Sequence, residues 1–199
     1  MIQRLTRLLW SAFLALPAFA QGQPAAVGGP RFLSGDRLER PANYREWVWL
    51  SSGLGMSYLP AAEGGANPAF DNVFVTPAAY RSFLQTGTWP DQTMFVLEVR
   101  ASQSKGSINQ SGRYQGAAMG IEAEVKDERR FPGKWAFFGF QGGADSASAF
   151  PKSQSCYLCH AQNGAVDNTF VQFYPTLLEV AKQKGTLKAR RAGALAKPH

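Results

Sequence analysis

QTMFVLEVRA, residues 92–101, is the stretch that decides the fold. Its side chains alternate along the chain, so Phe95, Leu97 and Val99 share one face of an extended segment while Glu98 points to the other. A period of two over ten residues is typical of a β-strand. The stretch therefore predicts one long strand with two different faces.

Segments on either side of this stretch also have the composition of strands. They are rich in β-branched and aromatic residues, and they cover residues 47–50, 70–75, 115–125 and 135–140. The connections between consecutive strands are too short for parallel crossovers. We therefore expect a mainly antiparallel sheet.

One short helix is predicted between the second and third of these strands. Thr76 followed by Pro77 is typical of an N-cap and a first helical position. Tyr80 and Phe83 recur at helical spacing until Gly87. An amphipathic helix is therefore expected to end at this glycine.

Further helices are predicted after the last strand. Asp167 can cap a helix that contains Phe170 and Leu177, and Pro175 is expected to kink that helix or divide it into two. The order of elements predicts an α+β fold, a mainly antiparallel β-sheet with flanking helices.

The first twenty residues are typical of a secretory signal peptide. Arg4 and Arg7 precede the apolar run of residues 8–19, and the segment closes on Ala18-Phe19-Ala20, an Ala-x-Ala cleavage site. The run is too short for a membrane span, and no later stretch reaches the roughly eighteen apolar residues that a span needs. We therefore expect a periplasmic protein that is not inserted in the membrane after cleavage.

The rest of the chain is expected to form one domain with two loose ends. Residues 21–43 lack an apolar period and are read as a flexible lead-in, residues 44–186 as the folded domain, and residues 187–199 as a basic tail. Signal cleavage lowers the net charge from +7 to +5. The tail is either solvated or docks to an acidic redox partner protein. Nucleic acid is not an expected partner, since the chain is exported and has no stacking motif.

CYLCH, residues 156–160, carries the chemistry. Cys156 and Cys159 are three residues apart and lie on one face of a helix, with His160 beside them. Two thiols at this spacing can add to the two vinyl groups of a porphyrin, while the imidazole reaches the iron. The motif predicts one covalently attached haem c on a helix near the C-terminus, with His160 as an axial ligand of the iron.

Two other interpretations of the cysteines stay open. An oxidising compartment permits a redox disulfide between them, although a thioredoxin-like pair should open a helix within a βαβ unit, which is absent here. A zinc site needs four ligands, and the sequence offers the two cysteines with only His160 and His199.

The sixth coordination position of the iron separates electron carriers from ligand binders. The methionines that remain as donors in the mature chain are Met56, Met94 and Met119, and a methionine in an apolar strand is usually packing. The sequence therefore favours a five-coordinate iron.

Several short motifs resemble the cytochrome P-460 family and its relatives, the cytochromes c′-beta. They are NVFV at 72–75, PAAY at 77–80, GTWPDQT at 87–93, VKD at 125–127, WAFF at 135–138 and DNTFVQFYP at 167–175. The resemblance runs from about Tyr44 to Thr186. It implies an antiparallel sheet with flanking helices, a homodimer, thioether anchors at Cys156 and Cys159, and His160 as the only protein ligand of the iron.

The resemblance also bears on activity. P-460 members oxidise hydroxylamine and carry a lysine cross-linked to the porphyrin, and Leu97 stands where that lysine would be. An aliphatic side chain cannot form the cross-link, so the chain looks more like the c′-beta members, which resemble binders of NO and CO. If Leu97 faces the haem, Phe95 and Val99 complete an apolar distal pocket, although the same face can simply be sheet core. Glu98 and Arg100 are then expected to point away as a solvated ion pair.

Three functions therefore stay open. A binding module would buffer or sense NO, an enzyme would oxidise hydroxylamine or NO, and an electron carrier would need a methionine as sixth ligand. An enzyme would also need polar groups near the iron.

Overall fold

The computed structural model describes residues 28–57 and 67–189. The predicted signal peptide and residues 190–199 of the predicted basic tail lie outside this range. The strands and helices are, in chain order, β1 (Leu38–Glu39), β2 (Val48–Leu54), β3 (Phe70–Val75), α1 (Pro77–Thr86), β4 (Met94–Gln103), β5 (Tyr114–Lys126), β6 (Trp135–Gly139), β7 (Ser146–Ala147), α2 (Ser155–Asn163) and α3 (Pro175–Lys184). None of the helices in the described part of the chain is both long and apolar enough to cross a membrane.

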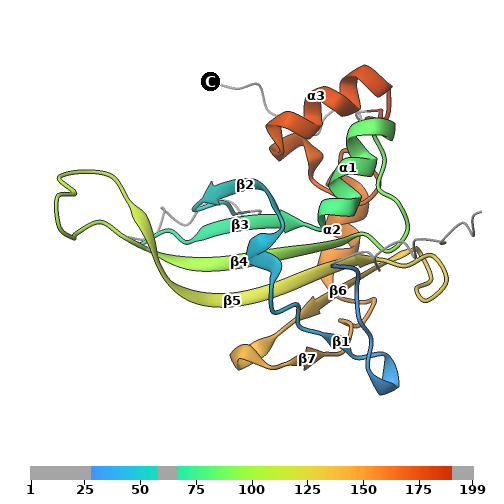
Figure 1. The fold of residues 1–199 in the computed structure, drawn as a ribbon, viewed down its shortest axis with the longest axis horizontal. Helices are drawn as coiled ribbons and strands as arrows, with labels where there is room; N and C mark the ends of the chain where they lie inside the picture. The colour runs from blue at the N-terminus through green and yellow to red at the C-terminus, as the bar shows by residue number, and fades with distance from the viewer. Residues whose placement is uncertain (1–27, 58–66, 190–199) are drawn as a thin grey trace, which may run out of the picture.

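The main sheet has five antiparallel strands in the order β2-β3-β4-β5-β6, which is also their order in the chain. β4 lies at its centre, and β4 and β5 extend together as a long hairpin away from the helices (Figure 1). The α+β class and the mainly antiparallel sheet predicted from the sequence are confirmed.

α1 begins and ends where the sequence places it. Pro77 occupies the first turn, and Gly87 closes the helix in the left-handed conformation, with φ of 74°. A side chain at this φ would be strained, so glycine suits the position. The hydroxyl of Thr76 makes no capping hydrogen bond to the helix. Thr76 instead takes part through its carbonyl, which accepts a hydrogen bond from the Tyr80 amide at 3.1 Å.

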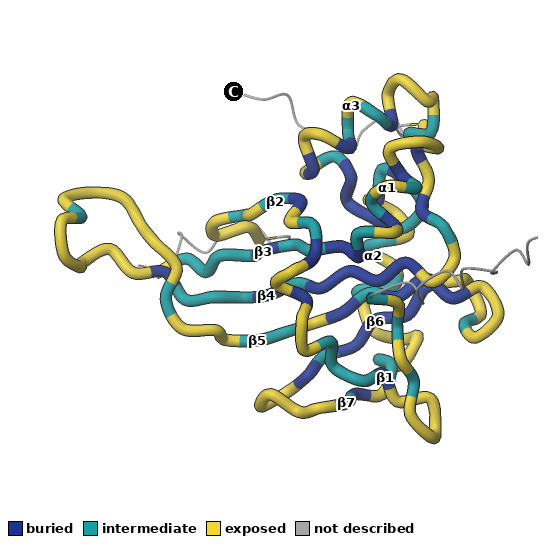
Figure 2. The backbone as a smooth tube through the Cα atoms, in the orientation of Figure 1, coloured by how far each residue is buried: buried dark blue, intermediate teal, exposed yellow. Residues whose placement is uncertain are grey.

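The sheet carries a separate hydrophobic cluster on each face. On one face, Phe95 packs with Phe83 of α1 and Leu177 of α3. On the other, Met94 and Val96 pack with residues from outside the helices. Figure 2 shows the sheet buried near the helices and more open along the hairpin, where β4 is half-buried and the outer part of β5 and the connecting loop are exposed. We call the first face the helix face and the second the lower face.

The lower face is covered by the N-terminal segment, which corrects one prediction. Leu38 of β1 pairs with Ala147 of β7 and is fully buried in the lower cluster. The stretch from Gly28 to Asn43, expected to be part of a flexible lead-in, therefore includes a strand that belongs to the folded body. Two-residue strands leave no period in the sequence, so alternation could not predict β1 or β7.

Glu98 is also placed differently from the expectation. It does pair with Arg100, at 3.0 Å, but its side chain is only 4% exposed and the pair is not solvated. The Tyr44 hydroxyl donates to the same carboxylate at 2.8 Å, and Arg45 forms a further ion pair with it. The segment before β2 covers this carboxylate, which the strand pattern of β4 could not reveal.

The segment after residue 167 contains two abutting helical pieces. A 3₁₀ turn spans Val171–Phe173, and α3 then begins at Pro175. The expectation that Pro175 would divide the pattern is confirmed. The expected cap at Asp167 is wrong, because Asp167 lies outside both pieces in a left-handed conformation, with φ of 51°.

Candidate functional site

α2 presents the three residues of the predicted motif. Cys156, Cys159 and His160 are all half-buried, and the two cysteines are free thiols. Leu158, between the cysteines, is 61% exposed. The helix thus keeps both thiols and the imidazole partly covered, and no disulfide joins the two cysteines.

The imidazole of His160 is held by a backbone carbonyl. Its Nδ1 lies 2.8 Å from the carbonyl oxygen of Asn168, so Nδ1 carries the proton and donates it. The rings of Phe137 and Phe170 each lie 4.4 Å from the imidazole, measured between centroids. A hydrogen bond from one ring nitrogen to a backbone carbonyl leaves the other nitrogen, Nε2, to bind a metal.

A buried carboxylate lies beside the same nitrogen. Glu124 Oε1 is 3.4 Å from His160 Nδ1 and, among the described residues, has no aligned hydrogen bond. Burial raises the pKa of Glu124, and His160 offsets only part of this rise. Burial alone would lower the pKa of His160, but Glu124 and the Asn168 carbonyl raise it above its ordinary value. The Nδ1 side of the imidazole therefore faces two oxygen acceptors, the Asn168 carbonyl and the Glu124 carboxylate.

The strand register shows which side chains follow Glu124 along the helix face of the sheet. Glu124 is opposite Phe137, and two residues further along β5 Glu122 is opposite Leu97 of β4. Residues directly opposite each other on paired strands share a face, so Leu97 and Glu122 lie on the helix face. Two residues of a strand span about 7 Å, so this row is one side-chain layer away from the imidazole.

The residues of the predicted distal pocket differ in their exposure to solvent. Phe95 is 3% exposed and packs against Trp89 at 4.7 Å between ring centroids, so it is part of the helix-face cluster. Leu97 and Val99 are half-buried on the same face. The distal pocket stays a prediction, and of its three residues Leu97 and Val99 keep accessible surface.

Sequence reasoning missed the carboxylates on this face. Asp71 is opposite Val99, in the row beyond Leu97 and Glu122. Burial raises the pKa of Asp71. Glu122 keeps contact with solvent, but the protein atoms around it and then the Asp71 carboxylate raise its pKa. The alternation of β5 is visible in the sequence, but only the register shows that Glu122 meets Leu97.

The methionines considered as sixth ligands are either packed on the other face of the sheet or exposed on the surface. Met94 is 1% exposed and packs in the lower cluster, on the opposite face of the sheet from the helices. Met56 and Met119 are 42% and 66% exposed. Within the described part of the chain, no group of three or more His, Cys, Asp or Glu side chains could hold a metal ion. A four-ligand zinc site therefore finds no support among these residues.

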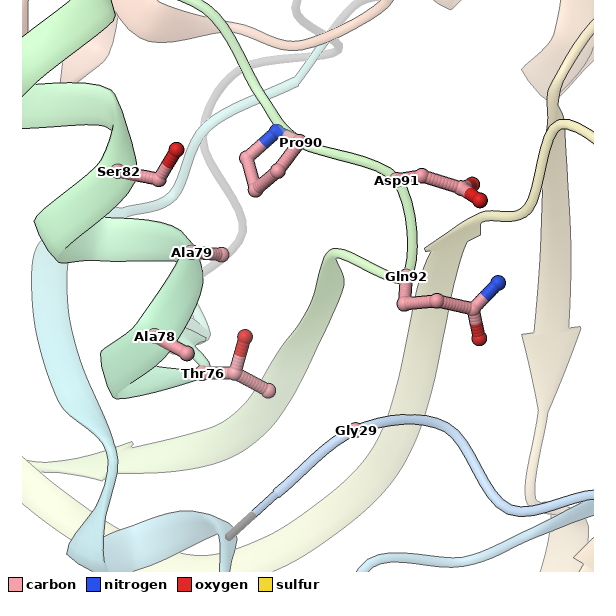
Figure 3. Close-up of a pocket in the computed structure, with 8 residues that line it drawn as sticks. All are labelled: Gly29, Thr76, Ala78, Ala79, Ser82, Pro90, Asp91 and Gln92. Atoms are coloured by element: carbon pink, nitrogen blue, oxygen red, sulfur yellow. The ribbon is translucent and has the colours of Figure 1, made fainter. Parts of the chain in front are cut away.

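A cavity of about 310 Å³ lies elsewhere, between α1, the turn before β4 and Gly29. Figure 3 shows the side chains of Asp91 and Gln92 pointing away from α1, while Ala78 and Ala79 face the space. A binding site needs a few polar groups that converge on a ligand. In this cavity the polar groups on the side of α1 are the hydroxyls of Thr76 and Ser82, and it holds none of the residues of the predicted motif.

The residues on α2 suit a haem. Two thiols and an imidazole lie on one helical face, the histidine is oriented through Nδ1, and the helix face of the sheet, which carries both apolar side chains and carboxylates, lies beside the imidazole. These features define a haem-binding cytochrome as the class of protein.

The family model described as Cytochrome P460 matches residues 41–171. The chain belongs to this family, and the resemblance seen in the sequence is confirmed. No curated protein matches the chain.

Proposed function

We propose that the protein is an exported cytochrome with one haem c, joined by thioethers to Cys156 and Cys159 and held at the iron by His160 alone. In this proposal its sixth coordination position is open and binds small ligands such as NO or CO. Haem supplies an iron that binds diatomic gases when this position is free.

The observation that carries the proposal is the position of Met94. Of the methionines in the sheet it is the buried one, and it packs on the face opposite to α2, where it cannot reach an iron held by His160. Met56 and Met119 are surface side chains. The described residues therefore favour ligand binding over electron transfer by a six-coordinate haem.

The surface beside the motif also supports gas binding. Leu97, Val99 and Val73 present apolar side chains on the helix face, and these offer a ligand no hydrogen bond. Leu97 also stands where P-460 enzymes carry their cross-linking lysine. Small uncharged ligands suit such a surface better than charged ones.

A second candidate, oxidation of hydroxylamine or NO, is favoured by Glu122. Its carboxylate lies opposite Leu97, and a raised pKa makes a carboxylate a stronger proton acceptor. This candidate retains His160 as the ligand and assigns Glu122 the role of general base. Periplasmic location, a homodimer and a redox partner protein remain parts of the proposal that come from the sequence.

The test is an optical spectrum of the purified, exported protein, reduced and then exposed to CO or NO, together with its intact mass. A five-coordinate ferrous spectrum that changes with gas, and the mass of an ordinary haem c adduct, support the proposal. A six-coordinate spectrum that is indifferent to gas refutes it. Turnover of hydroxylamine by the same sample would favour the second candidate.

A further inference from the structure

The acceptor of the histidine proton lies in a short loop between α2 and the 3₁₀ turn. We call residues 164–170 the proximal loop. Asn168, whose carbonyl accepts from His160 Nδ1 at 2.8 Å, lies at the tip of this loop. Hydrogen bonds to the outer nitrogen of a metal-bound histidine set its orientation and its strength as a ligand. The position of the Asn168 carbonyl is therefore chemically important.

The tip of the loop is a tight turn. Val166 and Thr169 form a bridge, in which the Thr169 amide and hydroxyl both donate to the Val166 carbonyl, at 2.9 and 2.8 Å. Asp167 takes the left-handed conformation that lets the chain reverse here. Aspartate tolerates this conformation better than most residues. The Asn168 carbonyl thus lies within a turn whose shape depends on the conformation of Asp167.

The turn is tied to the sheet by a buried lysine. Lys126 at the end of β5 has a side chain only 8% exposed, and its Nζ donates to Asp167 Oδ2 at 3.2 Å. The same ammonium donates to the carbonyl of Trp89 at 2.7 Å. Trp89 closes the tie from the other side, because its indole donates to Thr169 Oγ1 at 2.8 Å.

Burying a lysine ammonium costs free energy unless its charge is paired, so the partners of Lys126 indicate why it is buried here. Its two hydrogen-bond acceptors are Asp167 in the loop and the carbonyl of Trp89, whose indole bonds to the loop. A second carboxylate, that of Glu128, lies further from the ammonium, at 3.7 Å. Through Asp167, the ammonium is one residue away from the carbonyl that orients His160. The contacts thus form one path from the sheet to the imidazole.

We infer that Lys126 and Asp167 are positioning residues that hold the Asn168 carbonyl in line with His160 Nδ1 and so set the donor strength of His160 toward the iron. This inference rests on the proposed function, because it assumes that His160 binds haem iron. It predicts an effect on the iron from residues that do not touch the haem.

The test uses the exported full chain with its haem. Asp167→Asn keeps the size and the left-handed tendency of the residue but removes the charge, Lys126→Met removes the ammonium, and Lys126→Arg retains a cation. Lys182→Met is the matched control, because Lys182 pairs with Glu179 on the exposed side of α3, at 2.7 Å. Readouts are the haem content, the iron–histidine stretching band of the ferrous protein and the reduction potential.

Asp167→Asn and Lys126→Met are expected to hold haem but to shift the stretching band to lower frequency and the potential to higher values, because a weaker acceptor makes His160 a weaker donor. Lys126→Arg should shift the band and the potential less than Lys126→Met does, because it retains a cation. Lys182→Met should shift neither. If Lys126→Met does not fold, Asp167→Asn alone decides.

An unchanged band and potential in Asp167→Asn, in a protein that holds haem on His160, would overturn the inference and leave the proposed function intact. An equal shift in Lys182→Met would also overturn it. A wild-type protein without an iron–histidine band would instead mean that the proposed function is wrong.

Discussion

Leu97 of β4 and Glu122 of β5 lie directly opposite each other, one row of side chains away from His160 on the helix face. One is apolar and the other can accept a proton, so the pair bears on both candidate functions. Gas binding depends on the apolar partner, while oxidation of hydroxylamine depends on the carboxylate.

Glu122→Gln separates these two functions. If the protein binds gas, the affinity for CO should change by less than about tenfold, since an amide of the same shape replaces the carboxylate. If it is an oxidase, turnover should fall by roughly a hundredfold or more, which is the range for loss of a general base. CO titration and turnover assays on one preparation measure both. Loss of CO binding with folding intact would contradict the first expectation.

The motif residues make a separate prediction about attachment. Cys156→Ala and Cys159→Ala should each leave haem joined through one thioether, and the double variant should release its haem on acid extraction. His160→Ala should lose the histidine-ligated spectrum. Ser155→Ala, at the exposed start of α2, is the control and should behave as wild type. Intact mass spectra and reduced spectra check these outcomes.

The carboxylate of Glu98 should contribute to stability. Burial by itself raises its pKa, but Tyr44, Arg45 and Arg100 together lower it below the ordinary value. Glu98→Gln should destabilise the protein at pH 7 by about 2 kcal/mol, less than for a fully buried pair, because Arg45 is 56% exposed. Urea unfolding measures this loss.

The loss from Glu98→Gln should shrink as the pH falls. A carboxylate with a lowered pKa stabilises the fold above its unfolded pKa and loses that effect as it is protonated. Glu179→Gln, on the exposed side of α3, should change the free energy of unfolding by less than about 0.5 kcal/mol. A constant difference between wild type and Glu98→Gln from pH 7 to pH 3 would contradict the prediction.

Tyr44 should make the protein sensitive to alkali. Burial and then the hydrogen bond to Glu98 raise its pKa to about 12, against about 10 for a free tyrosine. Between these values the unfolded chain releases a proton that the folded chain keeps, so stability falls as the pH rises. The loss is about 2 kcal/mol between pH 9 and pH 12. Tyr44→Phe should lose less over this range, as urea unfolding at several pH values will show.

The sequence predicts the sheet well because β4 and its neighbours are long enough for alternation to be visible. The helix from Pro77 to Thr86 is equally clear, since proline and Gly87 mark its ends. Leu38 shows the opposite case, because a two-residue strand is stabilised only by β7, more than a hundred residues later. Contacts of that range leave no local pattern.

The candidate site shows the same difference between local patterns and long-range contacts. Cys156 and His160 are predicted from spacing alone, because their chemistry is local to one helix. Glu122 and Glu124 are found only from the register of β4, β5 and β6. Asn168 accepts through its backbone carbonyl, so its side chain gave no indication of this contact.

α2 differs from the other helices in one respect. α1 and α3 each bury two side chains, whereas α2 has no fully buried residue. An element with little buried surface can open at a small cost in free energy while the rest of the fold stays intact. We therefore expect α2 to open more easily than α1 or α3 while the sheet stays folded, which under the proposed function would uncover both thiols for haem attachment.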